Sequence, residues 1–152
     1  MELYTKYYNV PLLACTIMAC LRHQNTIDIA RLSLFFPALL DKSIEDKLSS
    51  KYEKVTLSNL LSLYQQSLSN YNSRYYTLLP YFVSSLSLLM DTGAVLLNEG
   101  QIINRSNGLF DDMENWRESE KLQKIIITSD ILISITEAKS TRALYNLFNV
   151  EL

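Results

Sequence analysis

Residues 55–104, VTLSNLLSLYQQSLSNYNSRYYTLLPYFVSSLSLLMDTGAVLLNEGQIIN, decide the fold. A helix is expected to begin at Thr56, because apolar residues then recur with the 3.6-residue period of one helical face. We interpret residues 70–79 as a short aromatic element. Pro80 suits the first turn of a further helix through Asp91, since proline has no amide hydrogen to leave unpaired there. The apolar face of the first helix comprises Leu57, Leu60, Leu61, Tyr64 and Leu68.

Two short apolar runs follow these helices, after a Gly93 that suits a left-handed helix stop. The runs are residues 94–97 and 101–103, and Asn98-Glu99-Gly100 between them is typical of a tight hairpin turn. Three helices followed by a small hairpin are the order of a winged helix. The sequence therefore predicts a mainly α fold with a winged-helix-like core, about 55–104, that carries one small β-hairpin.

The N-terminal part of the chain, about 9–54, is also expected to be helical. Asn9-Val10-Pro11 is typical of a helix start, since Asn caps free amides and Pro fits the first turn. A second helix should begin at Thr26, and Pro37 should kink or end it. A short third helix should open near Ser43.

The C-terminal part, about 118–149, should contain two more helices. Residues 122–136 carry enough β-branched side chains for strands, but their apolar spacing favours a helix, and the choice between the two stays open here. A last helix should begin at Ser140. All three parts are expected to form a single domain, residues 1–152.

Charge is almost absent from the middle of the chain. Between residues 55 and 104 only Arg74, Asp91 and Glu99 are charged, and the whole chain has a net charge of −2. In a winged helix the helix that enters a DNA groove would be 81–91, which contains no Lys or Arg. This composition argues against a protein whose main task is to bind nucleic acid, and it suits contact with another protein.

The sequence offers little to an enzyme mechanism. The chain has one histidine, His23, two cysteines five positions apart on a helix, and three glycines, too few for a phosphate-binding loop. The acidic residues Asp111, Asp112 and Glu114 most simply form an exposed turn. Two short acidic-x-Lys tripeptides fall on expected helices, where the nuclease arrangement would need a strand. We therefore expect no catalytic residue, no cofactor and no metal site.

No stretch of about 20 apolar residues is present, and residues 1–10 lack the pattern of a secretory signal. We therefore expect a cytoplasmic protein with no membrane partner. The tyrosines supply large apolar area with a polar tip, which suits protein interfaces. The expected partner-interface residues are Tyr7, Tyr8, Arg74, Tyr75, Tyr76 and Tyr81.

Several short motifs occur in order along nearly the whole chain, with Asn149 standing where a glycine would be expected. The motifs are NVPLL (9–13), LFFPALL (34–40), SRYY (73–76), LLP (78–80), DTGAV (91–95) and LFNVEL (147–152). Together they are similar to motifs of the middle components of bacterial three-component ABC systems, which include the anti-phage and anti-plasmid Lamassu group.

This resemblance implies a non-enzymatic adaptor subunit. It would bridge a coiled-coil, SMC-like ABC ATPase and an effector subunit, often a nuclease, in a hetero-oligomer that touches DNA only within the complex, if at all. Two alternatives remain open from the residues alone. One is a stand-alone winged-helix DNA-binding transcription regulator, and the other is an antitoxin-like protein that blocks a toxin enzyme.

Overall fold

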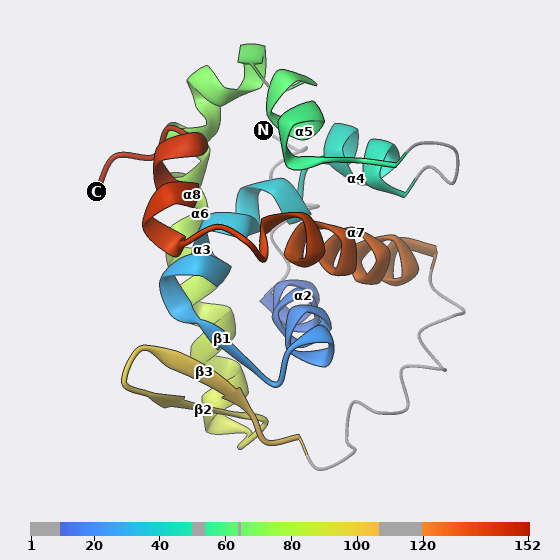
Figure 1. Cartoon of the computed structure of the whole chain (residues 1–152). Coiled ribbons are helices and arrows are strands. Elements are labelled where there is room, and N and C mark those ends of the chain that lie inside the picture. The colour runs from blue at the N-terminus through green and yellow to red at the C-terminus, as the bar shows by residue number, and fades with distance from the viewer. Residues whose placement is uncertain (1–9, 50–53, 64, 107–119) are drawn as a thin grey trace.

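The computed structural model describes residues 10–49, 54–63, 65–106 and 120–152, and within them the chain is mainly helical with one small antiparallel sheet (Figure 1). Helix α2 lies between α6 and α7, and α8 lies beside the upper half of α6. The helices are α2 (Val10–His23), α3 (Ile29–Leu39), α4 (Lys42–Leu48), α5 (Leu57–Leu63), α6 (Gln65–Asp91), α7 (Glu120–Thr136) and α8 (Thr141–Leu147). The strands are β1 (Thr26–Asp28), β2 (Val95–Asn98) and β3 (Gln101–Asn104).

Strand β1 was not expected, and it corrects the predicted helix start at Thr26. The strands are ordered β1-β3-β2, and Ile27 of β1 pairs with Ile102 of β3. Helix α3 begins only after Asp28, whose Oδ1 accepts hydrogen bonds from the amides of Ala30 (2.7 Å) and Arg31 (3.1 Å). The β-branched pair Thr-Ile therefore extends the hairpin, because a free strand edge lies next to it.

Helix α6 is one continuous helix of 27 residues, which corrects the prediction of a short aromatic element followed by a new helix at Pro80. Its buried side chains continue across the proline at spacings of three and four residues. Packing this stripe outweighs the roughly 3 kcal/mol that a proline costs inside a helix. The stripe comprises Tyr71, Tyr75, Leu78, Phe82, Leu86 and Leu89.

Smaller corrections concern the other helix boundaries. The helix predicted to start at Thr56 ends at Leu63 instead of continuing to Leu68, where α6 has already begun. Helix α3 ends two residues beyond Pro37, so this proline lies inside the helix near its end. The cap of α4 is Asp41, whose carboxylate accepts from the amide of Ser43 at 2.8 Å.

The remaining predicted elements are confirmed. Gly93 has φ +73° and donates its amide to the carbonyl of Met90 at 3.0 Å, which ends α6. Glu99 and Gly100 both have positive φ, as a two-residue type I′ hairpin requires. Residues 122–136 are helical, within α7. The sequence predicted three helices before the hairpin within 55–104, whereas the structure has two there, α5 and α6. The mainly α fold with a small β-hairpin is confirmed.

One hydrophobic core joins these elements. Its buried members run from Leu13 of α2 to Val150 after α8, and they include Ile27 and Ile102 of the sheet. The predicted core of 55–104 is therefore not self-contained, since α2, β1 and α3 pack into the same interior. Helix α6 contacts α2, α3, α5 and β2. This long helix consequently has one face against the core and one face directed outward.

Candidate functional site

The outer face of α6 is apolar and almost uncharged. Five large hydrophobic side chains lie on it: Tyr76, Tyr81, Val83, Leu88 and Met90, with exposed fractions between 37 and 53%. Between them lie the exposed residues Ser73, Thr77, Pro80, Ser84 and Ser87. Asp91, at the end of the helix, is the one charged member of this set. We use the name outer face for these eleven residues.

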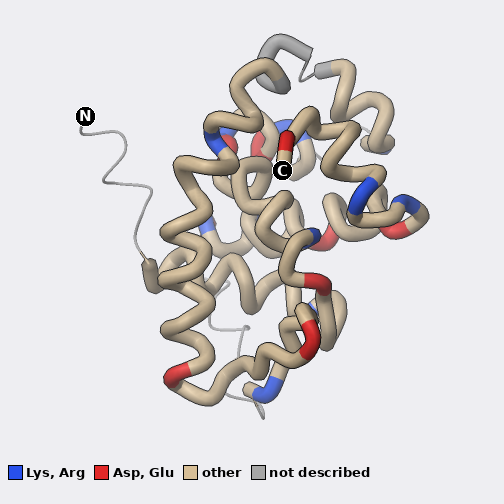
Figure 2. The backbone as a smooth tube through the Cα atoms, turned by 90° about the vertical axis from the view of Figure 1, so that its left-hand side faces the viewer, with Lys and Arg blue, Asp and Glu red and all other residues tan. Residues whose placement is uncertain are grey.

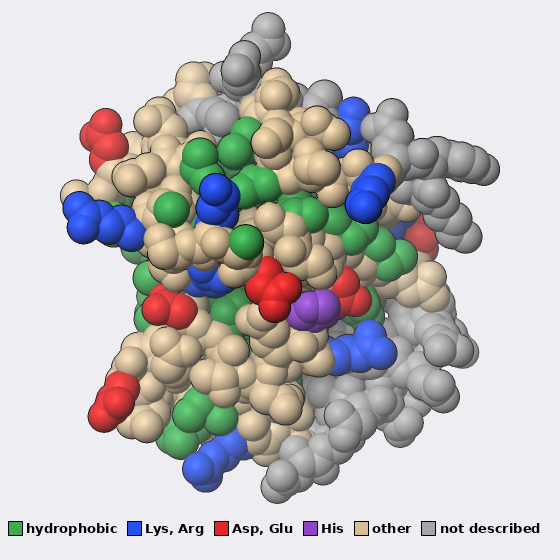
Figure 3. Space-filling view, viewed as in Figure 1, with side chains coloured by type: hydrophobic (Ala, Val, Ile, Leu, Met, Phe, Trp, Pro, Cys, Tyr) green, Lys and Arg blue, Asp and Glu red, His purple; other side chains and the backbone are tan. Residues whose placement is uncertain are grey.

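The low charge of α6 can be followed along its backbone. Figure 2 shows the long α6 tube without acidic or basic positions over most of its length. The face of the molecule seen in Figure 3, by contrast, carries Lys, Arg, Asp and Glu side chains interspersed with apolar ones. Interspersed charge is the ordinary condition of a solvated surface, and a charge-free helix face with several half-exposed hydrophobic side chains is typical of an interaction surface.

The large side chains of the outer face form two rows. Tyr76, Val83 and Met90 follow one another at intervals of seven residues, which is two helical turns, so they lie along one line of the helix. We call this line the Val83 row. Tyr81 and Leu88 have the same spacing and form the Leu88 row. Because Val83 and Leu88 are five residues apart, the rows lie about 140° apart around the helix axis, with small residues between them.

Two of the six predicted interface residues lie on this face. Tyr76 and Tyr81 are exposed, by 47 and 37%. The Tyr76 hydroxyl also donates a hydrogen bond to the carbonyl of Glu151, so the C-terminal residues lie beside the start of the Val83 row. Tyr7 and Tyr8 lie outside the described residues.

The structure corrects the prediction that Tyr75 lies at a partner interface, because its side chain is only 5% exposed. Its hydroxyl lies 3.2 Å from the hydroxyl of Tyr145 and 3.4 Å from that of Ser33. The Tyr145 hydroxyl in turn donates to the carbonyl of Ala30 at 2.7 Å. Burial raises the pKa of Tyr145, so this hydroxyl keeps its proton at physiological pH. Tyr75 therefore joins α6 to α3 and α8 in the interior and cannot present its ring to a partner.

Arg74 stays a predicted interface residue, and its side chain is paired within the molecule. Its Nη1 donates to Oδ2 of Asp41 at 2.6 Å, and its Nη2 donates to the carbonyl of Pro37 at 3.1 Å. Asp41 is at the same time the N-cap of α4. The guanidinium therefore ties α6 to the turn between α3 and α4. This pairing leaves α6 without a free cation for a phosphate group.

Val83 and Leu88 belong to the outer face but were not predicted individually. The sequence indicates these two exposed positions only indirectly. Once residues 71, 75, 78, 82 and 89 are known to be buried on a single helix, positions 83 and 88 must face outward. Treating Pro80 as a helix start left the rotation of the preceding segment free, and the outward positions could not be identified.

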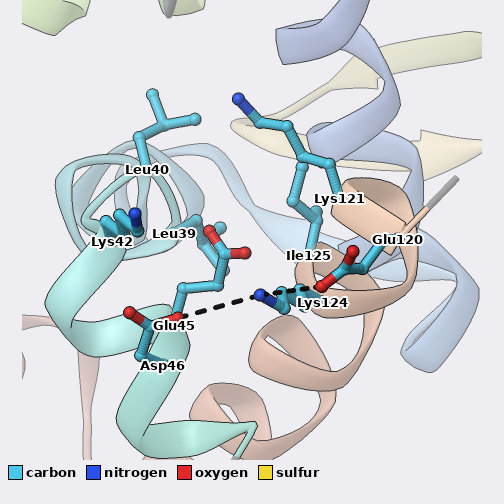
Figure 4. Close-up of a pocket in the computed structure, with 9 residues that line it drawn as sticks. All are labelled: Leu39, Leu40, Lys42, Glu45, Asp46, Glu120, Lys121, Lys124 and Ile125. Atoms are coloured by element: carbon cyan, nitrogen blue, oxygen red, sulfur yellow. Dashed lines mark ion pairs between the residues drawn. The ribbon is translucent and has the colours of Figure 1, made fainter.

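A pocket of about 330 Å³ lies away from this face, between α4 and α7 (Figure 4). Lys124 reaches across it, with its Nζ 3.3 Å from a carboxylate oxygen of Glu120 and 3.8 Å from one of Asp46. Burial raises the pKa of Glu45, and the charges of Lys124 and Lys121 oppose this shift. The three lysines that line the pocket are matched by three carboxylates, so it offers no net charge to an ionic ligand. The lining residues are Leu39, Leu40, Lys42, Glu45, Asp46, Glu120, Lys121, Lys124 and Ile125.

The candidate nucleophiles and metal ligands occupy structural positions. Cys20 is fully buried, and burial, with a contribution from the Asp130 charge, raises its pKa to about 12. Nδ1 of His23 lies 3.3 Å from Oδ1 of Asp130, which links α2 to α7. Within the described ranges, no group of three His, Cys, Asp or Glu side chains could hold a metal ion. The acidic turn with Asp111, Asp112 and Glu114 lies outside those ranges.

Comparison of the chain with protein-family models, with curated proteins and with solved structures gave no match. In the part of the chain that the structure describes, no helix combines the length and the apolar character needed to cross a lipid bilayer.

Proposed function

We propose that this chain is a non-enzymatic adaptor subunit that binds other proteins through the outer face of α6. The observation that carries the proposal is the composition of that face: five half-exposed large hydrophobic side chains, two of them tyrosines, and no charge before Asp91. Protein interfaces are depleted in charged residues at their centre and enriched in Tyr and Met. The hydrophobic side chains of this face are exposed to water in the free protein, and their burial against a partner would lower the free energy.

The resemblance to middle components of three-component ABC systems names the partners of this proposal. One is an SMC-like ABC ATPase, and the other is an effector subunit, often a nuclease, in a cytoplasmic defence complex. The adaptor would contact DNA only inside that complex, if at all.

The proposal is tested by measuring binding of the ATPase to variants of the Leu88 row. Tyr81→Glu and Leu88→Glu each place a carboxylate within the expected interface, where it would lose water without gaining a partner. We expect each change to weaken binding at least about tenfold, about 1.4 kcal/mol. The measurement is a quantitative pull-down with the purified ATPase of the same system.

Ile127→Glu is the matched control for this test. Ile127 is 43% exposed on α7, close to the exposed fractions of Tyr81 and Leu88, but it lies on a different helix. We expect this variant to bind like the unchanged protein. Equal recovery of the ATPase by all three folded variants would count against the outer face as the binding surface.

A stand-alone winged-helix transcription regulator is the second candidate, favoured by the element order that ends in α6 and the β2–β3 hairpin. A regulator of this kind binds duplex through several cationic contacts, and its affinity falls steeply as salt rises. Helix α6 supplies only the paired Arg74, and the hairpin region supplies Glu99 and Arg105, whose charges cancel. Selective, salt-sensitive duplex binding in a gel-shift series would favour the regulator over the adaptor.

A further inference from the structure

We propose that the pocket between α4 and α7 binds a small zwitterion with an apolar body, such as a free amino acid with an aliphatic side chain. None of the residues that line this pocket belongs to the outer face of α6, so the inference does not depend on the adaptor role. The volume of about 330 Å³ is within the range of small-molecule sites. The pocket combines an apolar floor with a rim that carries both signs of charge, and each part selects one property of the ligand.

The floor of the pocket is apolar. Leu39 at the end of α3 and Ile125 of α7 are each 1% exposed, so they form its inner wall. Leu40 is partly exposed and lines the same pocket. An aliphatic group that displaces water from this floor gains the free energy of burying apolar surface. A ligand that is polar over its whole length would lose water here without compensation.

Glu45 presents an unpaired carboxylate to the same space. In Figure 4 its side chain extends from α4 to a point beside Leu39, and the two dashed ion pairs join other residues. Among the described residues, none forms an ion pair or a hydrogen bond with the Glu45 carboxylate. Burial raises the pKa of this carboxyl, and the positive charges of Lys124 and Lys121 only partly offset that shift. A ligand ammonium would therefore meet a partly desolvated carboxylate that has no other partner.

Lys42 supplies the opposite charge on the rim. It lies three residues before Glu45, so both side chains are on the same face of α4. Lys42 also forms no ion pair with another residue of the described ranges. A ligand whose ammonium and carboxylate lie a few bonds apart can pair with Glu45 and Lys42 together.

The charge balance of the rim favours a zwitterion over a simple ion. For a ligand with one charge, the attraction of three rim groups is opposed by the repulsion of three others. A ligand that carries both charges can place each end next to its opposite and keeps the total at zero. We expect a dissociation constant on the order of 1 mM or below, because the ligand is small and part of its surface stays in water.

Three forms of leucine test this inference with the purified chain. L-leucine carries both charges, leucinamide only the positive one and N-acetylleucine only the negative one, and all three share one side chain. The measurement is an NMR titration of the isotope-labelled protein, read at the amides of Leu39, Leu40 and Ile125. We expect L-leucine to bind at least about tenfold more tightly than either singly charged form. Equal binding of L-leucine and one of the other forms, or no shift with L-leucine, would overturn the proposal.

Two variants locate the charged contacts. Glu45→Gln should weaken L-leucine binding at least about tenfold and remove the preference for L-leucine over N-acetylleucine. Lys42→Met should weaken it similarly and remove the preference over leucinamide. Glu45→Gln is expected to fold, because it replaces a partly buried charge with a neutral group of the same shape.

Glu137→Gln is the matched control, since it makes the same chemical change at an exposed carboxylate outside the pocket. This variant should bind L-leucine like the unchanged protein. Unchanged binding in Glu45→Gln, with circular dichroism showing the native fold, would overturn the assignment of the pocket. The titration contains no partner protein, so its outcome is separate from the test of the outer face.

Discussion

Tyr75→Glu is expected to unfold this protein at neutral pH, whereas Tyr81→Glu, about 120° around the same helix, should leave its stability within about 1 kcal/mol of the unchanged value. Tyr75 is 5% exposed and Tyr81 is 37% exposed. A carboxylate at position 75 would be buried beside the Tyr145 and Ser33 hydroxyls, neither of which carries a positive charge. The cost of burying an unpaired charge is several kcal/mol, comparable with the whole stability of a domain.

The measurement is urea denaturation followed by circular dichroism. Tyr75→Phe separates the two contributions of the side chain, because it keeps the ring and removes only the hydroxyl. We expect Tyr75→Phe to lower the free energy of unfolding by about 1 kcal/mol, the usual effect of losing one hydrogen-bonding group. A stably folded Tyr75→Glu protein would contradict the buried position of this side chain and return Tyr75 to the candidate interface.

Arg74→Met is expected to lower the free energy of unfolding by about 2 kcal/mol, between the effects typical of exposed and of buried ion pairs. The pair is intermediate in exposure, since the Arg74 side chain is 34% exposed and that of Asp41 is 16% exposed. Removing the guanidinium leaves the Asp41 carboxylate and the Pro37 carbonyl without their Arg74 hydrogen bonds. Methionine keeps most of the apolar stem, so the variant isolates the charge and its hydrogen bonds.

Arg74→Lys is the conservative control for this prediction. Lysine retains the charge but cannot reproduce the two directed donors of a guanidinium, so about half of the loss should remain. Both variants are compared by urea denaturation and by pull-down of the ATPase. An unchanged free energy of unfolding together with lost binding would show that Arg74 contacts a partner, as the sequence predicted.

The sequence predicted the parts of the fold that depend on local signals. Gly93 and Gly100 have positive φ, which glycine indicates directly, whereas Glu99, also at positive φ, carries no such signal. The helical spacing in 122–136 favoured the helix that the structure shows as α7, although the β-branched residues left a strand open. Strand β1 could not be predicted in this way, because it has three residues and pairs with a strand more than 70 positions away. Its formation depends on an edge that only the folded hairpin provides.

The candidate site was predicted in part for a related reason. Position 80 carries a strong local signal, and a proline near a possible helix start usually marks that start. Here the buried stripe on both sides of Pro80 decides the outcome, and it joins the two segments into α6. Because α6 is one continuous helix, the position of its buried stripe determines which tyrosines face the core. Tyr76 and Tyr81 are therefore exposed as expected, and Tyr75 is buried although it lies between Arg74 and Tyr76 in the sequence.

The most direct measurement of the central claim is the affinity of the purified chain for the ATPase and for duplex DNA, each at about 50 and about 200 mM salt. An apolar interface on α6 predicts ATPase binding that changes little with salt and is lost in Leu88→Glu, together with weak duplex binding at the higher salt. Tight duplex binding that falls steeply with salt and is unaffected by Leu88→Glu would contradict it.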